Sequence, residues 1–325
     1  MLLAGVMEIE KSAKRIRPRH RYELEDLLSV RVPPEPAGYA EKWREWREEA
    51  LEVSPLPSLK DAGYDRGDWR VFDLRYQSTD KVEIGGWALL PKSGRVERGF
   101  VISHGYGGRL APDYHFPFKN AALMFPCARG ISRSPHPPIS HEPRWHVRHD
   151  IDKPERYVLR GCVEDVWLAV SAMLRLAPYL EGHIGYLGTS FGGGVGAMAL
   201  AWEDRVQKAH LKVPSFGHQM LRLQLKTMGS AASVQTLYKK EPRLVENTLQ
   251  WFDAAQSAKH IKIPMHLACA LADPVVTPAG QFAIFNALSG PKELFTLEAG
   301  HMEYPDQEKQ EKQLLRELSS FFSDL

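Results

Sequence analysis

The residues with the clearest chemical meaning are a serine and its flanking glycines, in Gly188-Thr189-Ser190-Phe191-Gly192. The apolar residues before them, 184–187, predict a short buried strand, and the small residues after them, 193–201, predict a helix. A serine on a sharp strand-to-helix turn is exposed as a nucleophile at the edge of a sheet. Glycines beside it allow strand and helix to approach closely, because glycine has no Cβ atom. The pattern alone is equally compatible with a glycine-rich turn that has no chemistry.

A serine hydroxyl is a useful nucleophile at neutral pH only when a base takes its proton and an acid orients that base. Asp273 follows the apolar run 263–271, and His301 follows the run 292–297. Both residues therefore lie where a predicted strand ends. Their order along the chain, serine then acid then histidine, is the order of α/β-hydrolases. We predict a catalytic triad of Ser190, His301 and Asp273.

Acyl transfer also needs two preorganised main-chain N–H donors for the oxyanion of its tetrahedral intermediate. The residue after the nucleophile supplies one donor in this arrangement, which predicts the N–H of Phe191. A glycine-rich turn at residues 103–108 follows another apolar run and can expose further N–H groups. We predict the N–H of Tyr106 as the second donor, and a structural role for His104.

The elements that must position these residues alternate between strands and helices. Two runs with a period of two predict antiparallel neighbours, at 69–76 and 82–90, and five apolar runs predict further strands, at 99–103, 121–125, 184–187, 263–270 and 292–297. Amphipathic helices are predicted at 39–51, at 163–174 and near the C-terminus. This alternation predicts an α/β fold, specifically an α/β-hydrolase fold with a mostly parallel central sheet and helices on both faces.

Composition and breaker residues suggest how the chain is divided. We predict an N-terminal arm and a helix packing on the core over residues 1–65, and an α/β-hydrolase domain over residues 66–325. The segment at about 214–258 is helical in character and lies between core strands, which predicts a helical insertion near the site. The basic run at 14–21 is expected to be a solvated arm.

Composition excludes several classes of partner. The 325 residues carry 42 basic and 40 acidic side chains, a formal net charge of +2, so neither nucleic acid nor a membrane is expected as partner. Three distant cysteines with no Cys-x-x-Cys pair predict neither a disulfide framework nor a thiolate metal site. The N-terminus is a poor signal peptide, and no apolar run is long enough to span a membrane. We predict a cytoplasmic protein.

Taken together, these motifs resemble the acetyl xylan esterase / cephalosporin C deacetylase family of α/β-hydrolases. The resemblance covers roughly residues 37–322 and is carried by segments 104–107, 129–130, 188–193, 213–214, 251–255, 285–293 and 300–301. It implies hydrolysis of acetyl esters on small sugars and related alcohols by Ser190, Asp273 and His301. It also implies a small-molecule ester substrate, no cofactor and a possible homo-oligomer.

Four residues differ from the usual pattern of that family. Phe191 and Ile131 stand where glutamine is usual, Cys127 where an acidic residue is usual, and Met302 where glutamate is usual. An apolar wall to the pocket is therefore expected. This leaves two alternatives open: a general carboxylesterase or thioesterase with a different acyl preference, and a hydrolase-like protein that binds a ligand without turnover.

A histidine-rich loop at 131–160 invites a metal-site interpretation, because imidazole and carboxylate suit zinc. Its candidate ligands are His136, His141, His146, His149, Asp150 and Asp152. Their spacing fits neither a helical pair nor a known finger, and the prolines among them make a closed cage difficult. We predict a polar surface or rim loop and no metal site.

Overall fold

The structure, a computed structural model, describes residues 19–325. Residues 14–18 of the basic run, and the first 18 residues of the predicted arm, lie outside the described part. In the described part, nine strands form one mixed sheet in the order β1-β2-β3-β5-β4-β6-β7-β8-β9. The strands are β1 Ser58–Arg66, β2 Trp69–Gln77, β3 Glu83–Pro91, β4 Arg98–Ser103, β5 Ala121–Pro126, β6 Ile184–Thr189, β7 Lys208–Lys212, β8 Met265–Ala270 and β9 Lys292–Leu297.

The sheet is antiparallel at one end and parallel through the rest. Strands β1, β2, β3 and β5 pair antiparallel in that order. From β5 through β4, β6, β7 and β8 to β9, every neighbouring pair is parallel. The parallel part aligns the carboxyl ends of its strands along one edge, where α/β folds bind their ligands. The predicted α/β-hydrolase fold, with its mostly parallel sheet and helices on both faces, is confirmed.

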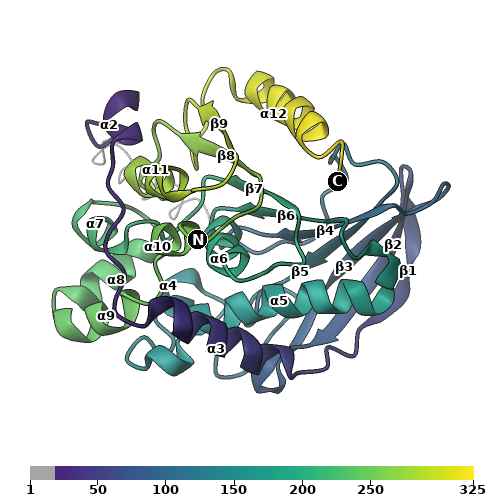
Figure 1. Ribbon diagram of the computed structural model, residues 1–325, viewed down its shortest axis with the longest axis horizontal. Coiled ribbons are helices and arrows are strands. Elements are labelled where there is room, and N and C mark those ends of the chain that lie inside the picture. Colours follow the sequence, from purple (N-terminus) through teal and green to yellow (C-terminus); the bar gives the residue numbers. More distant parts are fainter. Residues whose placement is uncertain (1–18) are drawn as a thin grey trace, which may run out of the picture.

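Helices cover both faces of this sheet (Figure 1). Those of the described residues are α2 Leu24–Leu28, α3 Tyr39–Leu51, α4 Pro143–His146, α5 Val158–Leu176, α6 Phe191–Leu200, α7 Gln219–Gln224, α8 Ser230–Tyr238, α9 Pro242–Leu249, α10 Ala254–Ala258, α11 Pro278–Ala287 and α12 Gln307–Phe321. Helices α7 to α10 occupy the connection between β7 and β8. No helix in this part of the chain combines the length and the apolar character that crossing a membrane requires.

Two apolar cores lie on opposite sides of the sheet. The larger core includes buried residues of α3, α5, α6, α10 and α11. Within it, the ring of Trp43 on α3 meets the ring of Trp167 on α5 at 6.2 Å. The smaller core lies beneath α12, where Phe100 of β4 stacks on Phe118 at 4.0 Å between ring centroids. The parallel strands β4, β6 and β8 are thus almost wholly buried, whereas β9 at the margin is partly exposed.

The structure contains two strands that the sequence analysis did not predict. Strand β1 is almost wholly exposed and polar, and it pairs with β2 at the edge of the sheet. Strand β7 is only five residues long, with a lysine at each end and a histidine at its centre. Neither segment is apolar enough to be predicted as a strand from its sequence. The predicted division between residues 65 and 66 stays a prediction; β1 crosses it.

Candidate active site

Ser190 occupies the sharp turn between β6 and α6. Its main-chain angles are φ 55° and ψ −110°, a strained conformation for a residue with a side chain. Its N–H donates to the carbonyl of Lys212 at 2.8 Å, and its own carbonyl accepts from the N–H of Ser215 at 2.9 Å. These bonds tie the strained residue to the loop that follows β7. The turn therefore presents the serine side chain in one fixed direction.

The side chains of Ser190, His301 and Asp273 form one hydrogen-bonded line. His301 Nε2 lies 2.9 Å from Ser190 Oγ, and His301 Nδ1 lies 2.7 Å from Asp273 Oδ2. An ionised carboxylate can only accept a hydrogen bond, so Nδ1 carries the proton that points at Asp273. This leaves Nε2 free to accept a proton from the serine hydroxyl. The structure thus brings together the three side chains that the sequence predicted as a triad.

Four hydrogen bonds fix the carboxylate of Asp273. It is completely buried in the loop after β8, and its Oδ1 accepts from the N–H groups of Val275 and Val276 at 2.8 and 2.9 Å. Its Oδ2 accepts from the Gln281 amide at 3.1 Å as well as from His301. A Cβ atom on Gly300 would lie only 2.5 Å from that same Oδ2. Because Gly300 has no Cβ atom, Asp273 and His301 can approach closely enough to form their hydrogen bond.

The three residues differ in their access to solvent. Ser190 is 7% exposed, and the side chain of His301 is 23% exposed. Asp273 is sealed beneath them. Ser190 and His301 thus keep some contact with solvent, whereas the Asp273 carboxylate can act only through the imidazole.

The turn after β4 lies directly against the serine. The N–H of Gly192 donates to the carbonyl of His104 at 3.0 Å, and a Cβ on Gly105 would lie 3.7 Å from the Cβ of Ser190. The rings of Tyr106 and Phe191 are in contact, with centroids 4.2 Å apart. Within residues 19–325, the N–H groups of Tyr106 and Phe191 have no hydrogen-bond acceptor. Phe191 also begins α6, where N–H groups are free and the helix dipole is positive.

His104 is a buried neutral imidazole that braces this turn. Its Nε2 accepts from the N–H of Ala128 at 2.9 Å, so its Nδ1 carries the proton and donates to the carbonyl of Gly105 at 2.6 Å. Burial lowers the pKa of His104 to about 4. These contacts support the structural role predicted for it.

The histidine-rich loop does not bring its candidate metal ligands together. Among the described residues, no group of three or more histidine, cysteine, aspartate or glutamate side chains is placed to hold a metal ion. The expectation of a surface loop is wrong at His146, which is fully buried, although His141 is exposed. His146 ends the short helix α4, which packs on α8. The loop is therefore folded inward beside the site.

Arg129 anchors the neighbouring end of β5. Its guanidinium donates to the Asp165 carboxylate of α5 at 2.8 Å and to the Thr79 hydroxyl at 2.8 Å, and its main-chain N–H donates to Asp165 at 3.0 Å. Arg129 and Asp165 are both buried, so each charge is compensated by the other. This pair links β5, α5 and the turn before β3 behind the site.

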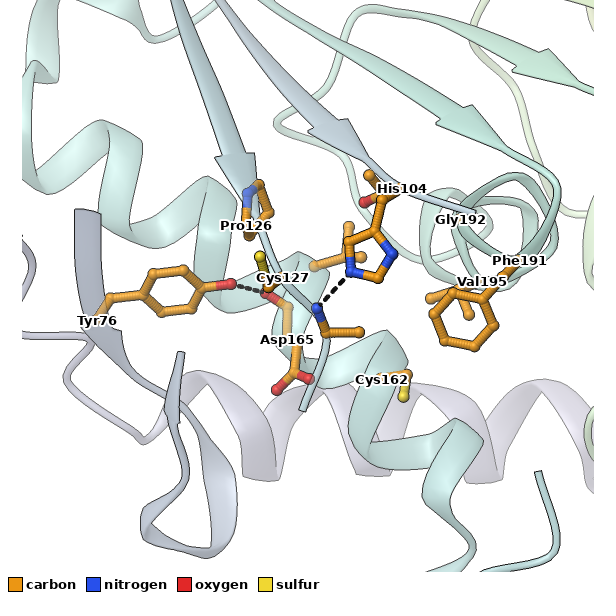
Figure 2. A pocket seen from close by; sticks show the side chains of 12 residues that line it. Tyr76, His104, Pro126, Cys127, Cys162, Asp165, Phe191, Gly192 and Val195 are labelled. Carbon is orange, nitrogen blue, oxygen red and sulfur yellow. Dashed lines mark hydrogen bonds between the residues drawn. The ribbon is translucent and has the colours of Figure 1, made fainter. Parts of the chain in front are cut away.

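A small cavity of about 20 Å³ lies behind Phe191 (Figure 2). Figure 2 shows His104 and Phe191 on one side and Tyr76 and Asp165 on the other. Cys127 also lines it. The volume suffices for about one water molecule and excludes any substrate. The cavity is therefore part of the protein interior beside the site and not a substrate pocket.

Comparison with known proteins identifies relatives over nearly the whole chain. A family model described as acetyl xylan esterase matches residues 23–319. An acetyl xylan esterase from Paenibacillus sp. R4 superposes with a TM-score of 0.81 at 20% identity, over 91% of this chain and 99% of that one. Acetyl xylan esterase 1 from Thermoanaerobacterium sp. JW/SL YS485 gives 0.78 at 19% identity, over the same shares.

A more distant match shares the fold over part of a longer chain. An acylaminoacyl peptidase from Pyrococcus horikoshii gives a TM-score of 0.58 at 17% identity, over 79% of this chain and 42% of that one. At such identities the superpositions show the α/β-hydrolase fold and nothing finer.

Proposed function

This chain belongs to the acetyl xylan esterase family and is a carboxylic ester hydrolase, and we propose that it is a serine esterase for short-chain esters, acetyl esters above all. The alcohol half is a small carbohydrate or a related alcohol. One observation carries the proposal: the hydrogen-bonded line from Asp273 through His301 to Ser190. That arrangement is the one that activates a serine for acyl transfer.

The proposed reaction begins when Ser190 Oγ attacks the carbonyl carbon of the ester. His301 Nε2 takes the hydroxyl proton as the new C–O bond forms, and Asp273 stabilises the imidazolium through Nδ1. The negative charge that develops on the carbonyl oxygen is held by the N–H groups of Tyr106 and Phe191. The contact between the rings of Tyr106 and Phe191, and the position of both residues next to Ser190, support this choice of donors.

The intermediate then collapses and breaks the bond to the alcohol. His301 gives its proton to the departing alcohol oxygen, which leaves Ser190 acylated. A water molecule attacks the acyl-enzyme with His301 again as base. His301 then gives this proton to Ser190 Oγ as the bond to the acyl group breaks, which releases the acid and restores the serine hydroxyl. Every proton in this cycle is carried by groups of the protein or by water.

Substitution of the nucleophile tests the proposal. Ser190→Ala is expected to abolish hydrolysis of p-nitrophenyl acetate, because no other hydroxyl occupies the end of the hydrogen-bonded line. The matched control is Ser215→Ala, which alters a neighbouring buried serine whose bond to Ser190 comes from its main chain. Retention of turnover by Ser190→Ala would refute the assignment.

A second candidate is a general carboxylesterase or thioesterase with a different acyl preference. The observation that favours it is the apolar character of Phe191 and Ile131, which are both buried beside the turn. A panel of p-nitrophenyl esters separates the two. A steep fall in kcat/KM beyond acetyl supports the acetyl esterase, and a flat profile supports the alternative.

The remaining functional expectations are also proposals. A protein that binds an ester without turnover would not react quickly with a fluorophosphonate at Ser190, whereas an activated serine would. A cytoplasmic location, a small-molecule ester as partner and a homo-oligomer stay predictions. Sedimentation of the purified protein checks the last of these.

A further inference from the structure

His146 is the buried histidine with direct contacts to both proposed oxyanion-hole residues. Its Nδ1 lies 2.9 Å from the hydroxyl of Tyr106, and its Nε2 lies 2.9 Å from the carbonyl oxygen of Arg129. Its ring meets the ring of Tyr106 edge-on at 5.4 Å, and that of Phe191 edge-on at 6.0 Å. His146 therefore links the histidine-rich loop to both of these residues.

The direction of each hydrogen bond follows from the partners. A carbonyl oxygen can only accept, so the proton of the neutral imidazole is on Nε2 and points at Arg129. Nδ1 then has a lone pair toward Tyr106, and the tyrosine hydroxyl donates to it. Burial lowers the pKa of His146 to about 4, so this neutral form persists at neutral pH.

The result is a connection between three separate segments of the chain. Tyr106 belongs to the turn after β4, Arg129 follows β5, and His146 belongs to the loop before α5. The main chain of Arg129 is itself fixed by the Asp165 carboxylate of α5. The side chain of Tyr106 is thus tied to a rigid point through one imidazole.

We propose that His146 is a positioning residue for the oxyanion hole: through Tyr106 it holds the turn 104–108 against Phe191, so that both N–H groups face one point. This inference rests on the proposed function. A bond that sets the direction of an N–H group stabilises the transition state more than the bound substrate, so its loss lowers kcat and leaves KM almost unchanged.

The test is a double-mutant cycle between Tyr106→Phe and His146→Phe, with p-nitrophenyl acetate as substrate. Activities are divided by the fraction of serine that a fluorophosphonate titrates, which removes misfolded protein from the comparison. Each single variant is expected to lose about tenfold in kcat, less than the 10²–10³ for removing a donor outright, because both N–H groups remain. The double variant is expected to lose no more than either single one.

A conservative variant and a control separate positioning from simple packing. In His146→Asn, the side-chain oxygen lies where Nδ1 was and can still accept from Tyr106, so kcat should recover to within about threefold of the wild type. His141→Phe alters an exposed histidine of the same loop and should leave kcat unchanged. If His146→Phe fails to fold, His146→Leu, which also removes the acceptor nitrogen, takes its place in the cycle with Tyr106→Phe.

Two results would overturn the inference: losses that multiply in the double variant, or a titrated kcat of His146→Phe within twofold of the wild type. Nitrogen NMR gives a readout that does not depend on turnover. It should show a neutral His146 protonated at Nε2, and protonation at Nδ1 would refute the proposed hydrogen bonds. Ser190→Ala tests the proposed function separately, so failure of one is distinguishable from failure of the other.

Discussion

Mild acid should destabilise this protein through two buried histidines. His104 and His146 each donate one ring proton to a carbonyl and accept a hydrogen bond at the other nitrogen, from Ala128 and Tyr106 respectively. At His104 a second ring proton would face the N–H of Ala128, and at His146 it would displace the hydrogen bond that Tyr106 donates and force that hydroxyl to turn. The folded protein therefore keeps both imidazoles neutral, and burial lowers the pKa of each to about 4.

The size of the effect follows from proton linkage. The unfolded chain, with a histidine pKa of about 6.5, binds more protons than the folded protein between pH 6.5 and pH 4. The stabilising contribution is therefore complete above about pH 6.5 and is lost as the pH falls toward 4. Between pH 7 and pH 5, the free energy of unfolding should fall by about 2 kcal/mol for each histidine, or about 4 kcal/mol for both.

Urea unfolding followed by tryptophan fluorescence at pH 5, 6 and 7 measures this fall. His146→Asn removes one titrating group and should lower the pH dependence by about 2 kcal/mol over the same interval. The difference between the two proteins isolates His146 from every other ionisable group. Equal pH dependence in the wild type and in His146→Asn would refute the argument.

Three further perturbations have definite expected outcomes. Gly300→Ala should lower kcat for p-nitrophenyl acetate by about a hundredfold, because its Cβ would displace the Asp273 carboxylate from His301. An unchanged kcat would show that the loop around residue 300 shifts to accommodate the methyl group. Arg129→Met should lower the free energy of unfolding in urea by about 3–5 kcal/mol, because it leaves the buried charge of Asp165 unpaired; a loss under about 1 kcal/mol would contradict this. Iodoacetamide should leave native esterase activity intact, because all three cysteines are buried and burial raises the pKa of each thiol; rapid inactivation would argue against it.

The positions of Ser190, Asp273 and His301 could be predicted because each follows a strong strand signal. An apolar run ends, a polar residue with useful chemistry follows, and parallel strands align their carboxyl ends at one edge. The structure joins their side chains in one hydrogen-bonded line, while their catalytic roles stay proposals.

The contact of His146 with Tyr106 could not be predicted, because a loop has no periodicity that fixes which side chain faces inward. Four histidines lie within 14 residues of one another in that loop, and only the folded chain distinguishes the fully buried His146 from the other three. Strand β7 was missed for a different reason: the three residues between its terminal lysines carry too little apolar pattern. Both features depend on contacts with segments distant in sequence.

The order of strands has a consequence for how activity is lost. The nucleophile follows β6 in the middle of the sheet, whereas the acid and the base follow β8 and β9, the last two strands at one margin. Local opening of that margin would remove Asp273 and His301 together and leave the serine turn intact. Inactivation by heat or urea should therefore precede loss of the core, and a nascent chain cannot hydrolyse an ester until residue 301 has been synthesised and β9 has paired.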